Sequence, residues 1–156
     1  MWGTIPNRTN YGIEVMRLEG EYTYSMDAKG RIAVPAKLRA ELGDVIYVSK
    51  GPDKSLFVYA ESNWLRIKER LASMPISKAR KLQLTLFPSA KRFELDAQGR
   101  VLLPQNLRDH AELVREVVIL GVVDRAEIWS ETVWRRFETD ELTPDNMLRA
   151  MDELGF

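Results

Sequence analysis

A nine-residue motif occurs twice in this chain, and no other feature restricts its possible folds as strongly. The segment DAKGRIAVP at residues 27–35 returns as DAQGRVLLP at residues 96–104, at a constant offset of 69 residues. Aromatic residues downstream recur at an offset of 70, which pairs Tyr59 with Trp129 and Trp64 with Trp134. A match of this length, with aromatic counterparts, indicates an internal duplication. We therefore expect one structural unit to be used twice.

Length and composition place the chain among ordinary globular proteins. With 156 residues, 45% of them hydrophobic, it can form one domain, or two small intertwined halves, around a real core. The absence of cysteine excludes disulfides, cysteine–zinc sites and thiol chemistry. No apolar run is as long as a membrane span, and the N-terminus lacks the apolar core of a signal peptide. We expect a cytoplasmic protein without a membrane partner.

The formal charges cancel over the whole chain but are unevenly distributed. Residues 61–92 contain eight Lys or Arg and two acidic residues, whereas residues 109–156 contain five Arg and twelve acidic residues. One part of the molecule can therefore be basic enough to bind a polyanion. The alternative is that these charged residues only form solvated helix faces. This alternative stays open, and the charge distribution, taken by itself, favours it.

Each repeat predicts the element order β-β-α-β-β. Asp and Gly in the motif favour a turn at residues 27–30, and Pro35 suits the first turn of a helix that stops at Gly43. The strands predicted in the first repeat cover residues 21–26, 31–34, 45–49 and 56–59, with the helix over 35–42. Those of the second repeat cover 93–95, 100–103, 117–120 and 127–129, with a helix from Pro104.

Further helices are expected after each repeat. Ser62 or Asn63 can cap a helix that ends before Pro75, and residues 77–87 and 131–137 have helical spacing of apolar residues. Thr143-Pro144 opens a last helix, whose apolar stripe consists of Met147, Leu148, Met151 and Leu154. We expect all these stripes to pack into the core rather than to form a groove for a partner.

The repeats divide the chain into five segments. They are a flexible leader or extension over 1–18, with Met16 as a candidate for the natural start, a first repeat over 19–66, connecting helices over 67–89, a second repeat over 90–137 and a C-terminal helix over 138–156. A unit of about fifty residues buries too little apolar surface to be stable alone. We therefore expect an α+β fold in which the two repeats interleave their hairpins into one barrel-like core with a pseudo-two-fold axis and peripheral helices packed around it.

The paired motif resembles that of the MraZ family, bacterial transcriptional regulators built from two AbrB/SpoVT-like swapped-hairpin motifs. The resemblance covers roughly Glu19 to Asp140 and includes Asp, Gly, Arg and Pro of both motifs. It implies a swapped-hairpin barrel and a sequence-specific DNA-binding protein, associated with the nucleoid, at the promoter of the division and cell-wall gene cluster. It also implies a ring-like homo-oligomer that binds direct repeats in double-stranded DNA.

The motif residues themselves suit contact with DNA. Arg31 and Arg100 leave equivalent turns, where a guanidinium group can contact guanine O6 and N7 in the major groove. Lys29 suits a phosphate, and Gln98 an adenine edge or a phosphate. The residues expected to contact DNA are Lys29, Arg31, Arg39, Gln98, Arg100 and Arg108, with Arg39 and Arg108 in flanking positions.

The remaining motif residues are expected to shape the turns. Asp27 and Asp96 should cap their turns or pair with the nearby arginine, although direct DNA contact remains the alternative. The glycines allow the turn and the prolines begin the helix that follows. The turn-shaping residues are Asp27, Gly30, Pro35, Asp96, Gly99 and Pro104.

An enzyme is the less favoured functional class. The single histidine, His110, has no counterpart in the first repeat and is expected to be a solvated surface residue. The sequence has no metal-ligand cluster and no phosphate-binding loop, so we expect no catalytic residue, metal or cofactor. The remaining alternative is an antitoxin-type DNA-binding interaction module, since antitoxins use similar swapped hairpins. Antitoxins, however, usually have one such motif and a disordered tail, whereas this chain has two motifs and a patterned last helix.

Overall fold

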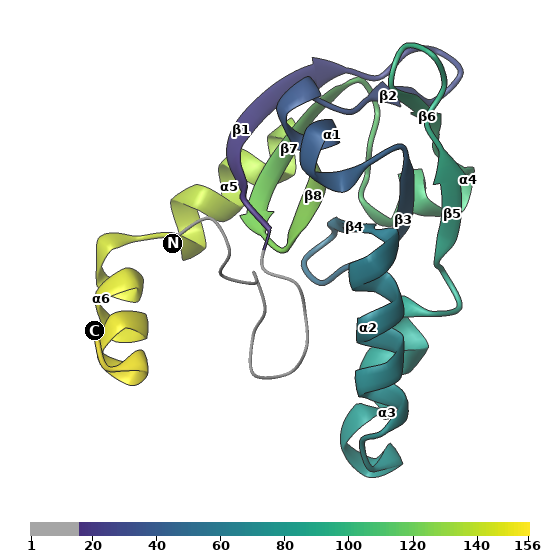
Figure 1. The fold of residues 1–156 in the computed structure, drawn as a ribbon. Helices are drawn as coiled ribbons and strands as arrows, with labels where there is room; N and C mark the ends of the chain where they lie inside the picture. The colour runs from purple at the N-terminus through teal and green to yellow at the C-terminus, as the bar shows by residue number, and fades with distance from the viewer. Residues whose placement is uncertain (1–15) are drawn as a thin grey trace, which may run out of the picture.

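The structure is a computed structural model that describes residues 16–156. Most of the predicted leader over residues 1–18 lies outside these described residues. Within them the chain forms eight strands and six helices. The predicted α+β class is confirmed, and Figure 1 shows the arrangement.

The strands are β1 (Leu18–Ser25), β2 (Arg31–Ala33), β3 (Val45–Lys50), β4 (Leu56–Ala60), β5 (Lys91–Glu94), β6 (Arg100–Leu102), β7 (Glu116–Val123) and β8 (Arg125–Ser130). The helices are α1 (Ala36–Leu42), α2 (Glu61–Ala72), α3 (Ile76–Leu86), α4 (Gln105–His110), α5 (Glu131–Glu141) and α6 (Pro144–Leu154).

The predicted elements are all present, with differences at their ends. Strand β1 begins three residues before its predicted start, and β7 extends the predicted strand at both ends. The prediction that Ser62 or Asn63 caps α2 is wrong, because Ala60 is the N-cap residue. Asn63 is buried one turn further on, where its side-chain amide donates a hydrogen bond to the Asp124 carbonyl at 3.3 Å. This contact ties α2 to the β7–β8 turn.

Strand pairing joins the two repeats to each other. Six strands form an antiparallel sheet in the order β1-β7-β8-β4-β3-β5, and β2 and β6 form a separate two-stranded ribbon. Strand β1 of the first repeat pairs along its whole length with β7 of the second, from Leu18 opposite Val123 to Ser25 opposite Glu116. Strand β5 of the second repeat pairs with β3 of the first. Each repeat therefore gives its first strand to the other repeat.

The backbones of β1 and β7 approach closely at Gly121. A Cβ atom at this position would lie 2.4 Å from the Glu19 backbone nitrogen, so only glycine allows the observed distance. The residue paired with Gly121 is also a glycine, Gly20. These two glycines permit the inter-repeat strand pair.

The main hydrophobic core has contributions from both repeats. Leu38 and Ile46 of the first repeat and Leu107 and Val117 of the second belong to one buried cluster and are at most 1% exposed. This shared core joins the two repeats, and each repeat also adjoins a smaller buried cluster, around Trp64 for the first and around Trp129 and Trp134 for the second.

The aromatic residues that recur at an offset of 70 form two equivalent clusters outside this core. The ring centroids of Tyr59 on β4 and Trp64 on α2 lie 5.8 Å apart, and those of Trp129 on β8 and Trp134 on α5 lie 5.2 Å apart. Helices α2 and α5 are therefore attached to equivalent strands in the same way. The prediction that their apolar stripes pack inward is confirmed for Trp64 and Trp134.

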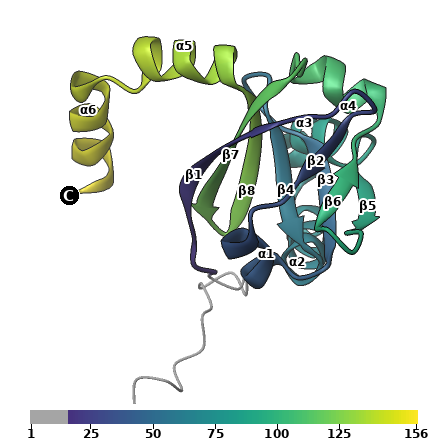
Figure 2. The same ribbon diagram turned by 90° about the horizontal axis from the view of Figure 1, so that it is seen from above.

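Helix α6 differs from the other helices because no residue of it is buried. Its predicted start is confirmed, since the Thr143 hydroxyl accepts a hydrogen bond from the Asn146 amide at 3.2 Å. The predicted packing of its stripe is wrong, because the apolar side chains are exposed. The reason is that the chain turns at residues 142–143, between α5 and α6, so that α6 stands away from the sheet (Figures 1 and 2). None of the helices described over residues 16–156 is long and apolar enough to cross a membrane.

Candidate nucleic-acid interface

The first motif forms a turn organised by the Asp27 carboxylate. Its Oδ1 accepts hydrogen bonds from the backbone amides of Lys29 and Arg31, both at 2.9 Å, and its Oδ2 lies 2.6 Å from Arg31 Nε. The Asp27 carbonyl accepts a further bond from the Gly30 amide at 3.0 Å, and Gly30 has a φ of 91°. One carboxylate thus closes the turn and holds the arginine that leaves it.

The second motif repeats this arrangement. Asp96 Oδ1 accepts from the backbone amides of Gln98 and Arg100 at 2.9 Å, and Oδ2 lies 3.0 Å from Arg100 Nε. The Gly99 amide donates to the Asp96 carbonyl at 2.9 Å. The same hydrogen bonds in both turns explain why Asp, Gly and Arg recur at the same spacing.

Hydrogen bonding favours the ionised form of both aspartates. The backbone amide of Arg31, with further hydrogen bonds from its side chain and from the Lys29 amide, lowers the pKa of Asp27 to about 2 and outweighs the opposing effect of desolvation. The backbone amide of Arg100 is the main cause of the lowered pKa of Asp96. Both turns therefore contain an Asp–Arg ion pair at neutral pH.

The ribbon of β2 and β6 brings the two arginines onto one face. Arg31 lies opposite Leu102, and Ala33 lies opposite Arg100, so these four residues share a face because strand residues alternate sides. Ile32 and Val101 point to the other face and are buried in the core. The ribbon is extended by bonds from the Leu103 amide to the Gly30 carbonyl and from the Val34 amide to the Gly99 carbonyl, at 3.0 and 2.8 Å.

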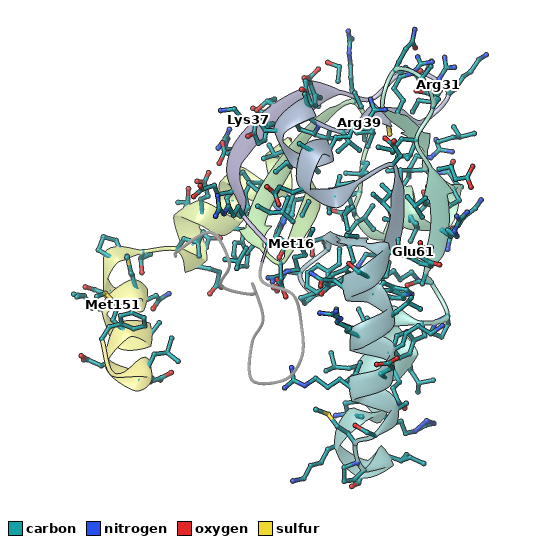
Figure 3. The ribbon with its side chains drawn as sticks, in the orientation of Figure 1. Met16, Arg31, Lys37, Arg39, Glu61 and Met151 are labelled. Atoms are coloured by element: carbon teal, nitrogen blue, oxygen red, sulfur yellow. The ribbon has the colours of Figure 1, made fainter. Side chains whose placement is uncertain are left out.

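Each guanidinium group is only partly occupied by its aspartate. The side chains of Arg31 and Arg100 are 35% and 32% exposed, and in both the contact to aspartate uses Nε. Among the described residues, no protein acceptor bonds to the terminal nitrogens of either arginine. Arg31 lies at the end of the molecule where β2 and β6 meet, opposite the end formed by α3 (Figures 1 and 3). The two arginines thus present hydrogen-bond donors on an outward face.

Arg39 and Arg108 hold the turns from the helices behind them. A Cβ atom on Gly99 would lie 2.8 Å from Arg39 Nη1, and one on Gly30 would lie 2.8 Å from Arg108 Cζ. Each arginine therefore packs on the turn of the opposite repeat. Arg39 Nε also bonds to Asp44 Oδ1, and Arg108 Nε to the Leu103 carbonyl, both at 3.0 Å. Besides any flanking contact with DNA, these two side chains have a structural role that the sequence did not indicate.

The other candidate residues lie where the motif placed them. Lys29 and Gln98 are exposed at the turns, and only their backbone amides are bonded to aspartate. Pro35 and Pro104 directly precede α1 and α4, and their carbonyls accept the first helical bonds from the amides of Arg39 and Arg108 at 2.8 and 3.1 Å. A candidate missed in the sequence is Leu102, 54% exposed beside the two arginines. Because side chains alternate between the two faces of a strand, the predicted strand over 100–103 already puts Leu102 on the same face as Arg100.

The prediction that His110 is a solvated surface residue is wrong. Its side chain is half-buried, and Nε2 lies 2.9 Å from the Gly51 carbonyl oxygen. The histidine therefore joins the end of α4 to the β3–β4 turn, a long-range contact with no sequence signal. Within the described residues, no three His, Cys, Asp or Glu side chains are grouped as a metal site would require.

Comparison with known proteins gives a consistent result. A family model described as "MraZ protein, putative antitoxin-like" matches residues 18–85 and again residues 86–150. Three similar curated proteins all have the name "Transcriptional regulator MraZ". The protein of Alkaliphilus metalliredigens is 42% identical over 139 residues, which is 87% of this chain and 97% of the relative. That of Caldicellulosiruptor saccharolyticus is 43% identical over 141 residues, 88% of this chain and 99% of the relative. That of Carboxydothermus hydrogenoformans is 46% identical over 120 residues, 76% of this chain and 84% of the relative.

Proposed function

This chain belongs to the MraZ family, and from this membership we propose that it is a sequence-specific DNA-binding transcriptional regulator and not an enzyme. The observation that supports DNA binding most strongly is the outward face of the β2–β6 ribbon, where Arg31 and Arg100 are held by equivalent ion pairs. A rigid two-stranded ribbon is narrow enough to enter the major groove.

The contacts differ between the residues of this face. The terminal nitrogens of Arg31 and Arg100 donate to guanine O6 and N7, while Nε stays on the aspartate. Lys29 and Gln98, exposed at the two turns, bind phosphates or an adjacent base edge. The exposed Leu102 is available for apolar contact with a thymine methyl group. Arg39 and Arg108 support the turns and contact flanking phosphates.

The details of the fold and of the assembly are proposed from the resemblance to the family. The exchange of β1 and β5 between repeats supports a swapped-hairpin arrangement with a pseudo-two-fold axis. We divide the chain into repeats over 19–66 and 90–137, with a leader over 1–18, connecting helices over 67–89 and a C-terminal segment over 138–156. In this proposal the protein is cytoplasmic and nucleoid-associated. It acts as a ring-like homo-oligomer on direct repeats at the promoter of the division and cell-wall gene cluster.

A DNA-binding antitoxin is the second candidate function. The description of the matching family contains the term antitoxin-like, and the exposed apolar stripe of α6 offers a surface for a protein partner. An antitoxin would form a stable complex with a toxin of different sequence. Purification of the chain from its own cells, followed by mass measurement of the complex, separates the two candidates.

The proposal is tested by electrophoretic mobility shift at fixed salt concentration. A promoter fragment with direct repeats is compared with a scrambled fragment of the same length and composition. We expect tighter binding to the promoter, because contact with base edges depends on sequence while contact with phosphates does not. Equal affinity for the two fragments would contradict sequence-specific recognition.

A further inference from the structure

The apolar stripe of α6 is too continuous to be an accidental surface. Met147, Leu148, Met151 and Leu154 are 66%, 61%, 37% and 74% exposed, and helical spacing puts them on one side of the helix. A contiguous apolar surface of this kind marks an interaction site. Asp145 and Asp152, seven residues apart, border the same edge of the stripe and give it a negative margin.

An apolar groove lies elsewhere on the molecule, between α2 and α3. It has a volume of about 340 Å³ and is lined by Ile67, Leu71, Met74, Leu82 and Leu86. Its inner end is formed by aromatic residues of β4, and Leu82 is 53% exposed although it belongs to the apolar stripe of α3. The prediction that this stripe packs entirely inward is therefore wrong at Leu82.

The charges around the groove are opposite to those of α6. Arg70 lines the groove, and the helices α2 and α3, which supply most of its lining, contain six basic and two acidic residues. Asp124, the acidic residue in the lining, is paired with Arg125 at 3.1 Å. An amphipathic helix with acidic margins suits a groove with apolar walls and a basic surround.

The positions of helix and groove indicate which molecule supplies the helix. Helix α6, where Met151 is labelled, and the α2–α3 pair lie on opposite sides of the body in two perpendicular views (Figures 1, 2 and 3). A chain in this conformation cannot place α6 in its own groove. We propose that α6 of one copy docks in the α2–α3 groove of the next copy. This head-to-tail contact uses two different surfaces, and such contacts form rings when the rotation between copies closes. The inference rests on the proposed homo-oligomer and names its contact surfaces.

Complementation between two blocked variants tests this pairing. Leu82→Asp puts a charge into the apolar groove and leaves α6 unchanged. Leu148→Asp puts a charge into the apolar stripe of α6 and leaves the groove unchanged. Light scattering at micromolar concentration should show that neither variant alone forms the wild-type assembly. An equal mixture should form dimers, in which α6 of the Leu82→Asp protein docks in the groove of the Leu148→Asp protein. The matched control is Leu84→Asp, on the same helix and 56% exposed but outside the groove, which should assemble like the wild type.

Cysteine cross-linking tests whether the contact is between chains. Because the sequence contains no cysteine, any disulfide that forms must join introduced cysteines. Met151→Cys on α6 and Met74→Cys in the groove are made as separate proteins. Oxidation of their mixture should yield a disulfide-linked dimer, and neither protein should cross-link efficiently alone. A third protein carries both substitutions, and a disulfide within that single chain, without linked dimers, would show that α6 folds back onto its own groove and would overturn the inference.

Assembly and DNA binding are measured separately, so that the two proposals can fail independently. Any of three results would overturn the docking inference. They are wild-type assembly by both Leu82→Asp and Leu148→Asp, a wild-type protein that is monomeric, and a mixture of the two variants that stays monomeric. The proposed function fails instead if the assembled wild type does not distinguish the promoter from the scrambled fragment.

Discussion

Replacing Arg31 by alanine should weaken DNA binding far more than it weakens the fold. The turn should persist, because the two hydrogen bonds from backbone amides to Asp27 Oδ1 do not involve the arginine side chain. Only the contact between Nε and Oδ2 is lost, and both side chains of that pair are 35% exposed. Pairs this accessible to solvent contribute little to stability, so we expect a fall in melting temperature of no more than about 2–4 °C.

The expected loss of affinity is larger. A bidentate contact to a base contributes about 1–3 kcal/mol, so each missing contact should weaken operator binding roughly 5- to 150-fold. The loss should be specific to the operator, since binding to scrambled DNA depends on phosphates. Arg31→Lys should restore the charge but little of the specificity, because an ammonium group lacks the planar donors.

Melting temperature, oligomer size and operator affinity must be measured on the same proteins. Arg135→Ala is a matched control, since this arginine is also exposed and ion-paired, to Glu21 and Glu138, but lies on α5 away from the ribbon. Asp27→Ala provides the structural comparison because it removes all three hydrogen bonds at once. A folded, normally assembled Arg31→Ala protein with wild-type operator affinity would refute base contact. A drop in melting temperature equal to that of Asp27→Ala would show that the arginine is mainly structural.

Three further predictions concern charge, pH and backbone geometry. Lys29→Ala should weaken binding to all DNA sequences alike and reduce the slope of log affinity against log salt concentration by about one, measured by fluorescence anisotropy; an unchanged slope would exclude a phosphate contact. The pKa of Asp27 is depressed to about 2 from an ordinary 3.8, so its contribution to stability is complete above the ordinary value and is lost as the pH falls toward 2. Denaturant unfolding at about pH 5 and about pH 2.5 should therefore show a smaller loss of stability for the Asp27→Asn/Asp96→Asn variant than for the wild type, and an equal loss would argue against this. Gly30→Ala should be more destabilising than Gly155→Ala, because both glycines have positive φ, which costs about 1–2 kcal/mol for other residues, but only at Gly30 does the new Cβ meet Arg108. Equal melting temperatures of these two variants would mean that Arg108 moves aside without cost.

The sequence was most informative where structure depends on neighbouring residues. The Asp and Gly of each motif and the prolines after them predicted both turns and the start of α1 and α4, because these residues act on the backbone next to them. Helical periodicity identified α6, but it cannot tell whether a stripe meets the core, and the exposure of Leu148 was therefore unexpected. The equivalence of the two turns indicated a shared role for Arg31 and Arg100, but the direct pairing of β2 with β6 joins residues far apart in the chain, such as Arg31 and Leu102, and was not predicted from local sequence.

The pairing of β1 with β7 also determines when the fold can be completed during synthesis. Residue Leu18 must wait for Val123, its pairing partner, to leave the ribosome. At elongation rates of 5–20 residues per second, the roughly hundred residues between them take on the order of 5–20 s. Throughout that interval β1 has no partner strand, and β3 has an open edge until β5 has been synthesised. Where several ribosomes follow one another on the same messenger, a neighbouring nascent chain exposes the same strands at the same time. The slow step in producing this protein is therefore the arrival of its second half, and the nascent first half is the state most exposed to mispairing.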